Sequence, residues 1–344
     1  MNANSNAPSL PNYPIESLLG SGGFGSSYLA RRESDGLACV VKVLAWDRLK
    51  DWKSLELFER EAKVLQGLSH PQIPQFLEYI QQDQTLCLVQ SYVPGQSLEQ
   101  WLKQKGNFTH SHVLDLALSL TEILVYLQKF SPPLIHRDIK PGNIIIDNRD
   151  QPHLIDFGAV RDTLNPATEA GGSTVVGTFG YMAPEQFQGK AYPASDIYSL
   201  GVTLIYALTR KAPEELESTG LQLNFRPWVK LPEAFADVLE KMIAPDWQHR
   251  YPDAKALQTD LLALKAGKPT SLQVQKNVWT EPLPAKYRTY LLLGGITFLL
   301  FAVLWQMFSP VSQKNREEIR KKIERTYEEQ YRERYGPLPQ KSPG

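Results

Sequence analysis

The sequence predicts an α+β protein with two lobes, followed by a helix that crosses a membrane. Five strand-like segments lie between Ile15 and Val93, and the chain from Ser97 onward is mainly helical apart from one hairpin. The 19 residues from Tyr290 to Phe308 include no charged side chain, and a run of that length can span a bilayer. Together these features predict a strand-rich lobe, a helical lobe and a transmembrane helix, in that order along the chain.

The composition argues against two broad classes of protein. The 344 residues include 37 basic and 37 acidic side chains, so the chain lacks the basic footprint of a nucleic-acid binder. Cys39 and Cys87 lie in apolar, strand-like runs, which is typical of reduced core cysteines in a cytosolic protein rather than of a secreted disulfide scaffold. Residues 1–12 are polar and lack the basic and apolar runs of a secretory signal, so we expect a flexible lead.

A glycine-rich turn follows the first predicted strand. Gly20, Gly22 and Gly25 have the spacing G-x-G-x-x-G, which alone is a weak signal because glycine-rich hairpin turns are common. In a dinucleotide-binding fold a helix would follow these glycines, but here the next residues resume as a strand from Tyr28. The sequence therefore predicts a hairpin, whose backbone N–H groups can fold over a triphosphate.

A lysine interrupts the apolar strand predicted over Leu37–Leu44. Lys42 is either an edge-strand charge that discourages aggregation or a buried cation that needs a partner. In the helix that follows, Glu61 shares one face with the apolar residues Phe58 and Leu65 at helical spacing. An inward lysine and an inward glutamate predict an ion pair.

The remaining predicted elements are two strands followed mainly by helices. Two more strands are predicted over Ile73–Ile80 and Leu86–Val93, and Pro94-Gly95 ends the sheet. Helices are predicted over Ser97–Gln104, Ser111–Lys129, Ala194–Leu208, Leu231–Ile243 and Ala254–Lys265. The segment 159–182 is too long for an ordinary connection, which indicates a functional or mobile loop.

Two polar segments flank a short predicted hairpin in the helical part. Leu134–Asn143 contains Asp138, Lys140 and Asn143, and His153–Gly158 contains Asp156. Taken singly, such residues are usually turn residues or helix caps. The hairpin, with predicted strands over 144–146 and 152–155, fixes the distances between them. This arrangement suits metal ions and a nucleophilic hydroxyl placed around a phosphate.

In their order and spacing, these motifs resemble the eukaryotic-type (Hanks-type) serine/threonine protein kinases, closest to their bacterial, membrane-anchored branch. The resemblance covers residues 13–265, with an N-lobe over 13–92 and a C-lobe over 93–265. It implies the bilobal kinase fold, in which a five-stranded N-lobe with helix C sits on a mainly helical C-lobe. It also implies ATP-dependent phosphorylation of serine and threonine residues on proteins, with autophosphorylation, in membrane-associated signalling.

The resemblance implies a role for each matched residue. Asp138 is the catalytic base, Lys140 steadies the γ-phosphate, and Lys42 contacts the α- and β-phosphates and pairs with Glu61. The expected ligands of Mg²⁺, for which Mn²⁺ can substitute, are Asn143 and Asp156. The expected ATP contacts are Leu19, Gly20, Ser21, Gly22, Gly23, Phe24, Gly25, Ser27, Val40, Lys42, Gln90, Ser91, Tyr92, Val93 and Ile145.

Two alternatives stay open beside an active kinase. A nucleotide-binding pseudokinase scaffold is the first, and the intact Lys42, Asp138 and metal ligands argue against it. A small-molecule phosphotransferase is the second, and it would not predict the docking segment GTFGYMAPE. Ser27 departs from the family pattern, in which a branched valine covers the adenine. The substitution thins the apolar roof of the pocket but removes no catalytic group.

The resemblance also implies structural and regulatory residues. It implies a buried ion pair between Glu185 and Arg250, and Asp196 as the polar anchor of the central helix of the C-lobe. Its regulatory residues are expected to be Arg137, Thr174 and Thr178. Thr178, with Lys140, favours serine or threonine over tyrosine as acceptor. A phosphate on Thr174 could pair with Arg137 and order the loop, unless Thr174 is an ordinary polar loop residue.

The C-terminal part predicts a membrane anchor and a charged tail. Residues 266–286 lack periodicity and predict a linker, 287–308 a transmembrane helix, and 309–344 a charged helical tail. Aromatic residues lie at both ends of the apolar run, as in an interfacial belt. A buried core helix is the alternative, and an uncharged run outside a finished domain fits it less well.

The expected topology is a single-pass membrane protein with a cytoplasmic kinase domain, because no export signal is present. The basic residues point the other way: segment 309–325 carries six and segment 271–289 carries three, and the more basic flank tends to be cytoplasmic. A re-entrant hairpin bent at Gly294-Gly295 would satisfy both arguments. The expected partners are protein substrates, the membrane and a second copy of the chain, bound through the tail or the kinase domain, but no nucleic acid.

Overall fold

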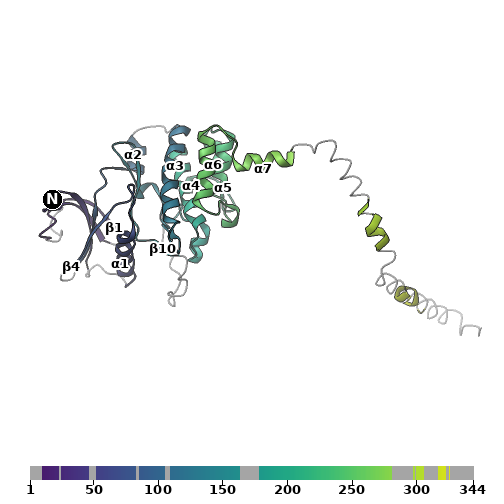
Figure 1. The fold of residues 1–344 in the computed structure, drawn as a ribbon, viewed down its shortest axis with the longest axis horizontal. Helices are drawn as coiled ribbons and strands as arrows, with labels where there is room; N and C mark the ends of the chain where they lie inside the picture. The colour runs from purple at the N-terminus through teal and green to yellow at the C-terminus, as the bar shows by residue number, and fades with distance from the viewer. Residues whose placement is uncertain are drawn as a thin grey trace, which may run out of the picture. The chain divides into compact units, whose positions relative to one another are not determined.

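The computed structural model describes residues 10–22, 25–45, 52–82, 85–104, 109–162, 178–280, 297–298, 300–305, 317–322 and 325. The chain divides into two compact units, Met1–Lys276 and Asn277–Gly344. The first unit has a strand-rich half at its N-terminal end and a helical half after it (Figure 1). The predicted two-lobed α+β architecture is therefore confirmed for this unit.

The N-terminal lobe is built on a five-stranded antiparallel sheet with strand order β1-β2-β3-β5-β4. Its strands are β1 (Ile15–Gly22), β2 (Gly25–Arg31), β3 (Ala38–Ala45), β4 (Phe76–Gln82) and β5 (Thr85–Ser91). Alternation puts Val41 and Val89 on one face, in a small apolar cluster. Leu10 and Tyr13 are buried in the same cluster. Leu10 therefore belongs to the packed lobe, although the sequence predicts a flexible lead over 1–12.

Helix α1 (Trp52–Gly67) packs against the opposite face of the sheet. Phe58, Ala62 and Leu65 are buried there, as their spacing predicts. They join the large core of the helical lobe, which also takes in Leu44 and Leu88 from the sheet. One continuous apolar core therefore connects the two lobes and fixes α1 between them.

The helical lobe consists of α2 (Leu98–Gln104), α3 (His110–Leu127), α4 (Pro193–Thr209), α5 (Glu233–Met242) and α6 (Ala254–Lys265). Helix α4 is buried almost all round, as its apolar sequence predicts. It approaches α5 so closely that a Cβ atom at Gly201 would lie 2.8 Å from Ile243 Cγ2. Thr109 and Asp253 cap α3 and α6 by accepting N–H groups of their first turns.

The predicted hairpin is present as β8 (Ile144–Asp147) and β9 (Pro152–Leu154), with β6 (Gly95–Ser97) beside β8. Asp150 turns the hairpin in the left-handed region, with φ 59°. Gln72, from the segment before β4, binds the hairpin in both directions, because its side chain donates to Pro152 and its carbonyl accepts from Leu154. The hairpin is thereby attached to the N-terminal lobe.

Short elements complete the first unit. They are β7 (Leu134–Ile135) paired with β10 (Arg161–Asp162), β11 (Ser218–Thr219) paired with β12 (Gln222–Leu223), and the 3₁₀ turns η2 (Pro141–Asn143), η3 (Pro184–Gln188), η4 (Pro213–Glu215), η5 (Arg226–Trp228) and η6 (Trp247–His249). Between β10 and η3, the structure describes the segment from Thr178 onward.

Helix α7 (Ser271–Thr280) occupies part of the stretch for which the sequence predicts an aperiodic linker. Its start is packed: Thr270 is fully buried, and the Ser271 N–H and hydroxyl groups both donate to the Asp260 carboxylate. The ordered domain thus continues past residue 265. The prediction ended there because no apolar period marks α7, whose start depends on this polar contact.

The membrane segment predicted over 287–308 lies mostly outside the described residues. Residues 297–298 and 300–305 are helical, as are 317–322 and 325 of the predicted tail. Within the described part of the chain, none of the helices has the length and apolar character needed to cross a membrane.

Candidate active site

The loop that carries Asp138 is tied to the start of α4. The backbone N–H groups of His136 and Arg137 both donate to the Asp196 carboxylate, at 2.8 Å each. Arg137 has a left-handed backbone, with φ 70°, and its carbonyl accepts from the Gln186 side chain. Burial raises the pKa of Asp196 to about 7, while the two N–H donors act to lower it. Asp196 is therefore the predicted polar anchor rather than only a helix cap.

Three polar side chains meet around the Asp138 carboxylate. Asn143 donates from Nδ2 to Asp138 Oδ2 at 2.8 Å, and Lys140 Nζ lies 2.8 Å from the same oxygen. The Thr178 hydroxyl donates to Asp138 Oδ1 at 2.9 Å and accepts from Lys140 Nζ at 2.5 Å. The contact with Thr178 spans forty residues and brings the docking segment to the catalytic loop. A carboxylate held from both sides in this way can accept a proton in a fixed direction.

Lys42 joins the sheet, α1 and the second acidic segment. Its ammonium lies 2.5 Å from Glu61 Oε1 and 3.1 Å from Asp156 Oδ1, which confirms the predicted ion pair and adds a second one. The Phe157 N–H also donates to Glu61, at 3.3 Å. Helix α1 and the Asp156 segment are therefore both drawn toward Lys42.

The electrostatics of this triad follow from burial and charge pairing. Burial acts to lower the pKa of Lys42, but the carboxylates of Glu61 and Asp156 outweigh it and raise the pKa above its ordinary value. Lys42 in turn lowers the pKa of Asp156, against the effect of burial. Burial raises the pKa of Glu61, with Lys42 opposing. At neutral pH the site thus holds a fixed ammonium beside an ionised, partly exposed Asp156.

A cavity of about 740 Å³ lies between the two lobes in this unit. Fifteen of the predicted site residues line it, namely Leu19, Gly20, Ser21, Gly25, Ser27, Val40, Lys42, Glu61, Gln90, Ser91, Tyr92, Val93, Asn143, Ile145 and Asp156. Gly22 ends β1 and is not among the lining residues, and Gly23 and Phe24 lie outside the described residues. The predicted ATP contacts are therefore largely brought together in one cleft.

Several lining residues were missed by the sequence analysis. Phe58 comes from α1, Pro74 from the approach to β4, and Glu99 and Gln100 from α2. Ile155 directly precedes Asp156, so its position in the acidic segment was a usable signal. The others belong to no motif, because they reach the cleft only through the packing of α1, α2 and the segment before β4.

Gly25 is required at the hairpin turn above the cleft. Its φ is +135°, and a Cβ atom there would lie 2.1 Å from the Val43 carbonyl oxygen. By contrast, a Cβ atom at Gly20 would meet nothing within 4 Å. The close approach of β2 to β3 therefore explains the third glycine of the motif sterically.

The segment between the lobes offers a backbone donor to the cleft. The Tyr92 N–H donates to Ala38, and the Ser91 N–H donates to Gln75. Among the described residues, no acceptor takes the N–H of Val93. An unused N–H at the cleft wall suits an acceptor on the edge of a nucleotide base.

The donor atoms suit a magnesium ion bound together with phosphates. Asn143 uses Nδ2 on Asp138, which leaves its Oδ1 for a metal, and Asp156 supplies a carboxylate on the same wall of the cleft. Over the described ranges, no group of three or more His, Cys, Asp or Glu side chains forms a metal cage. Mg²⁺ usually takes one or two protein oxygens and completes its shell with phosphates and water, so these two residues fit it.

The predicted structural pair of the helical lobe is present. Both terminal nitrogens of Arg250 donate to the Glu185 carboxylate, at 2.7 and 2.9 Å, and both side chains are buried. The Ser195 hydroxyl donates to the same carboxylate at 2.6 Å. This bidentate pair holds the end of the docking segment against the start of α4.

The structure describes two of the three residues predicted to be regulatory. Arg137 has a buried side chain next to the catalytic loop, and Thr178 lies in the Asp138 cluster. Thr174 lies outside the described residues.

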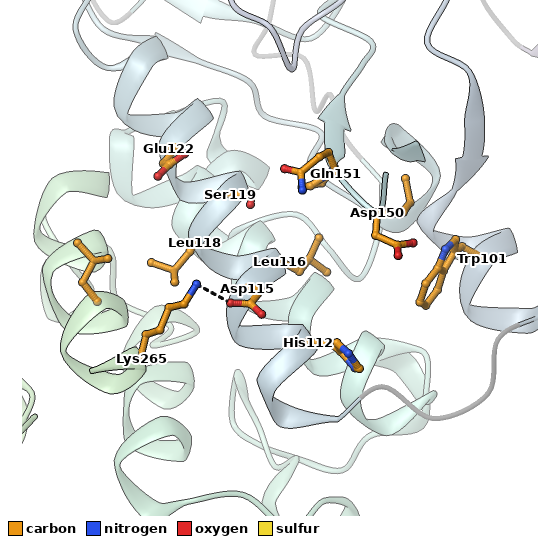
Figure 2. Close-up of a pocket in the computed structure, with 13 residues that line it drawn as sticks. Trp101, His112, Asp115, Leu116, Leu118, Ser119, Glu122, Asp150, Gln151 and Lys265 are labelled. Atoms are coloured by element: carbon orange, nitrogen blue, oxygen red, sulfur yellow. Dashed lines mark ion pairs between the residues drawn. The ribbon is translucent and has the colours of Figure 1, made fainter. Parts of the chain in front are cut away.

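A second cavity, of about 710 Å³, lies in the helical lobe between α2, α3, α6 and the β8–β9 turn (Figure 2). Asp115 and Lys265 form an ion pair of 2.9 Å at its wall, with Trp101 and His112 nearby. None of the predicted site residues lines it. The residues predicted to act on phosphate therefore lie in the first cleft, with Lys42 and the expected metal ligands, and not in this cavity.

Comparison with known proteins places this geometry in a family. The protein kinase domain model matches residues 13–273. The chain is 38% identical over 260 residues to serine/threonine-protein kinase B of Synechocystis, covering 71% of this chain and 45% of the relative. It is 38% identical over 270 residues to serine/threonine-protein kinase PknA of Nostoc, covering 74% and 47%.

A more distant relative is serine/threonine-protein kinase PrkC of Bacillus subtilis, 29% identical over 260 residues, covering 72% of this chain and 40% of the relative. The chain spans about half the length, or less, of these curated relatives. The match covers both lobes and every residue of the Asp138 and Lys42 clusters. The chain therefore belongs to the protein kinase domain family, in its eukaryotic-type serine/threonine branch.

Proposed function

We propose that this protein transfers the γ-phosphate of ATP to serine and threonine hydroxyl groups of proteins. The observation that carries the proposal is the hydrogen bond from the Thr178 hydroxyl to Asp138 Oδ1, with Lys140 beside both. A threonine hydroxyl can thus approach this carboxylate while a cation stands next to it. The acceptor hydroxyl of a substrate needs the same two neighbours.

In the proposed reaction, Asp138 accepts the proton of the attacking hydroxyl. A bond forms from the substrate oxygen to the γ-phosphorus, and the bond from that phosphorus to the β,γ-bridging oxygen breaks, which releases ADP. Lys140 stabilises the charge on the transferred group, and Lys42 holds the α- and β-phosphates. Bound Mg²⁺, which Asn143 and Asp156 would hold, supplies further charge neutralisation.

The pseudokinase alternative is less well supported. A scaffold without transfer has no need for the Lys42–Glu61 pair, which is formed here at 2.5 Å. Both this pair and a metal-facing acidic residue must be in place for transfer in protein kinases, and Asp156 lies 3.1 Å from Lys42.

The identity of the acceptor tests the proposal. The purified full chain would be incubated with γ-labelled ATP, Mg²⁺ and a mixture of unstructured proteins, and the labelled products hydrolysed to amino acids. We expect phosphoserine and phosphothreonine that disappear in Asp138→Asn. Label on phosphotyrosine alone, or label that persists in Asp138→Asn, would refute the proposal.

We further propose that the chain is anchored in a membrane through residues 287–308, with its kinase domain in the cytoplasm. The uncharged run of 19 residues and its flanking aromatic side chains support this. The full chain should remain in the membrane fraction after washing with alkaline carbonate, and a chain ending at residue 276 should not. Release of the full chain by the wash would contradict an integral anchor.

We also propose autophosphorylation at Thr174 as an activating step. Arg137, buried beside the catalytic loop, supplies the charge that a phosphate on that residue would meet. Thr174→Ala should lower substrate turnover, while the matched Thr168→Ala should not. Equal turnover in the two variants would remove Thr174 from this role.

A further inference from the structure

The second cavity is long enough to hold an extended peptide segment. Its volume of about 710 Å³ is within the range of binding pockets. One face of α3 forms its wall, through His112, Asp115, Leu116, Ser119 and Glu122. Between the first and the last of these the helix rises by about 15 Å, which matches about five residues of extended chain. Figure 2 shows this face between α6 on one side and Trp101 on the other.

The second cavity and the nucleotide cleft lie on opposite sides of the same elements. Ile145 and Ile146 are neighbours on β8, and the first lines the cleft while the second lines the cavity. Helix α2 is shared in the same way, because Gln100 lines the cleft and Trp101 the cavity. Among the described residues, none lines both. A molecule bound in the second cavity would therefore stay near the cleft and leave it open.

The rim of this cavity along α3 carries carboxylates that can be reached from solvent. Asp115 is paired with Lys265, but both side chains are more than half exposed, at 53% and 59%, so the pair is weak and open to exchange. Glu122, about two turns further along α3, is exposed and forms no ion pair with any residue that the structure describes. A basic side chain of a partner can therefore bind here without breaking a strong internal contact.

Apolar side chains supply the floor and the opposite wall. Leu116 and Ile146 are buried at the floor. Leu262 on α6 also lines the cavity, and 51% of its surface is exposed. An exposed leucine beside unpaired negative charge fits a partner that presents an apolar side chain next to a basic one.

We propose that the α3–α6 side of this cavity is a docking site for substrate proteins, and that it binds an extended segment with lysine or arginine beside leucine, isoleucine or valine. The inference rests on the proposed function, since the partner is a protein that the cleft phosphorylates. Glu122, Asp115 and Leu262 make the contacts. Asp150 lies on the opposite side of the cavity from Lys265 and is not one of them (Figure 2).

Docking of this kind has a defined kinetic signature. A segment held outside the cleft raises the local concentration of the acceptor hydroxyl and leaves the chemical step unchanged. It therefore lowers KM for the substrate and does not alter kcat.

A selection among tethered peptides tests the docking site. A short serine-containing acceptor would be joined to about five randomised positions through a flexible linker of about 20 residues, which spans roughly 25 Å. The purified full chain would label this library with Mg-ATP, and the labelled products would be sequenced. We expect wild type to enrich basic residues beside leucine, isoleucine or valine, and the selected segment to lower KM about tenfold at unchanged kcat.

Charge reversal assigns the selection to this cavity. Glu122→Lys should lose the enrichment of basic residues and favour acidic ones, and Leu262→Gln should lose the enrichment of apolar residues. The rate of each variant on the acceptor without the randomised positions serves as its reference, and thermal melting shows that each is folded. Glu33→Lys is the matched control, because Glu33 is an exposed acidic residue between β2 and β3 that lines neither cavity. It should keep the wild-type selection.

Three results would overturn the inference. Labelling of the acceptor by wild type without any selection would show that the cavity docks no substrate segment. Selection that persists unchanged in Glu122→Lys would place the docking on another surface. A dimer in sedimentation that Glu122→Lys dissociates, without selection, would assign the cavity to a second copy of the chain. All three leave the proposed function standing, whereas failure of wild type to label any acceptor would refute the proposed function itself.

Discussion

Lys42 shows how a single side chain can organise the site. Its position in an otherwise apolar strand admitted two interpretations, and the structure decides for the buried one, with Glu61 at 2.5 Å and only 18% of the Lys42 side chain exposed. The pair has a structural role. Glu61 comes from α1, and its contact with Lys42 sets the position of that helix against the sheet. Removing one partner leaves the other charge buried without compensation.

A double-mutant cycle on this pair is the first prediction. Lys42→Met should lower the free energy of unfolding by about 3 kcal/mol, because it leaves the Glu61 carboxylate buried without a cationic partner. The double variant with Glu61→Gln should be less destabilised than the sum of the single variants, by about 1–3 kcal/mol. Urea denaturation measures all four proteins. The exposed Lys103→Met, which breaks a surface pair with Glu99, serves as the control. Strict additivity would contradict a coupled buried pair.

His136 provides a prediction with a defined pH window. Its ring is fully buried edge-on against Phe157, and burial lowers its pKa below 6.5, although the nearby Asp138 and Asp156 act to raise it. Below pH 6.5 the unfolded chain binds a proton that the folded chain does not, so stability is fully present above that pH and falls as the pH drops.

Wild type should therefore lose up to about 1.4 kcal/mol of unfolding free energy per pH unit between pH 6.5 and 5.5 from this one group. His136→Phe keeps the ring but not the titration, so its curve should be flatter over the same range, although the variant is less stable overall. Urea denaturation at pH 7.5, 6.5 and 5.5 measures both. The exposed His249→Asn should keep the wild-type slope. An equal slope in His136→Phe would be the contradicting result.

At the scale of elements, the docking segment is fixed to the helical lobe by a few buried polar contacts. The Glu185–Arg250 pair joins η3 to the loop after η6, and Arg250 also donates to the carbonyl groups of Ala244, Pro245 and Ala194. One guanidinium thus contacts four carbonyl and carboxylate groups. The pair therefore stabilises the end of the segment that carries Thr178.

Arg250→Met should reduce the free energy of unfolding by about 3–5 kcal/mol, because it leaves the Glu185 carboxylate buried and unpaired. Arg226→Met is the matched control: Arg226 also binds several acidic side chains, but it is about a third exposed, so its loss should cost clearly less. Guanidinium denaturation monitored by tryptophan fluorescence provides the comparison. Equal losses in the two variants would contradict the special role of the buried pair.

Most elements could be predicted from the sequence because burial follows periodicity. The apolar strand predicted around Lys42 and the helical spacing of Phe58 and Leu65 in α1 are both present in the structure. Helix α7 could not be predicted, since its start depends on the Asp260 carboxylate rather than on an apolar stripe. Likewise, the contact between Thr178 and Asp138 follows from tertiary packing, and no local pattern encodes it.

The candidate site was predictable to a similar extent. The motifs identified Lys42, Asp138 and Asp156, because each stands out as a charge within or beside an apolar run. They did not reveal which polar atoms remain unsatisfied in the folded chain, and the buried Oε1 of Gln90 is of that kind. The motifs also did not place the predicted helix α2 at the site. Its Glu99 and Gln100 line the cleft because α2 packs against β6, η2 and β8.

At the scale of the whole molecule, a large apolar core joins the two lobes of the first unit, and the cleft between them brings together the charged residues of the proposed phosphoryl transfer. Leu44 and Leu88 of the sheet share that core with the helical lobe. The N-terminal lobe has in addition its own small apolar cluster on the other face of the sheet, around Val41 and Val89. A second unit follows after Lys276, and the membrane proposal concerns that part of the chain.

We propose that Asp138 acts as the base in phosphate transfer. If so, its carboxylate is needed for transfer but not for binding the nucleotide. The most direct measurement compares Mg-ATP affinity and phosphate transfer to protein in wild type, Asp138→Asn and Asp150→Asn. Asp150 is the matched control, because it lies in the turn of the β8–β9 hairpin that follows the Asp138 loop and does not line the cleft. Its backbone has φ 59°, which asparagine tolerates.

We expect Asp138→Asn to lower the transfer rate by about 10²- to 10⁴-fold, as for a lost general base, while Mg-ATP affinity stays unchanged. Asp150→Asn should match wild type in both measurements. Binding of Mg-ATP by wild type without transfer, or transfer by Asp138→Asn at the wild-type rate, would contradict the claim.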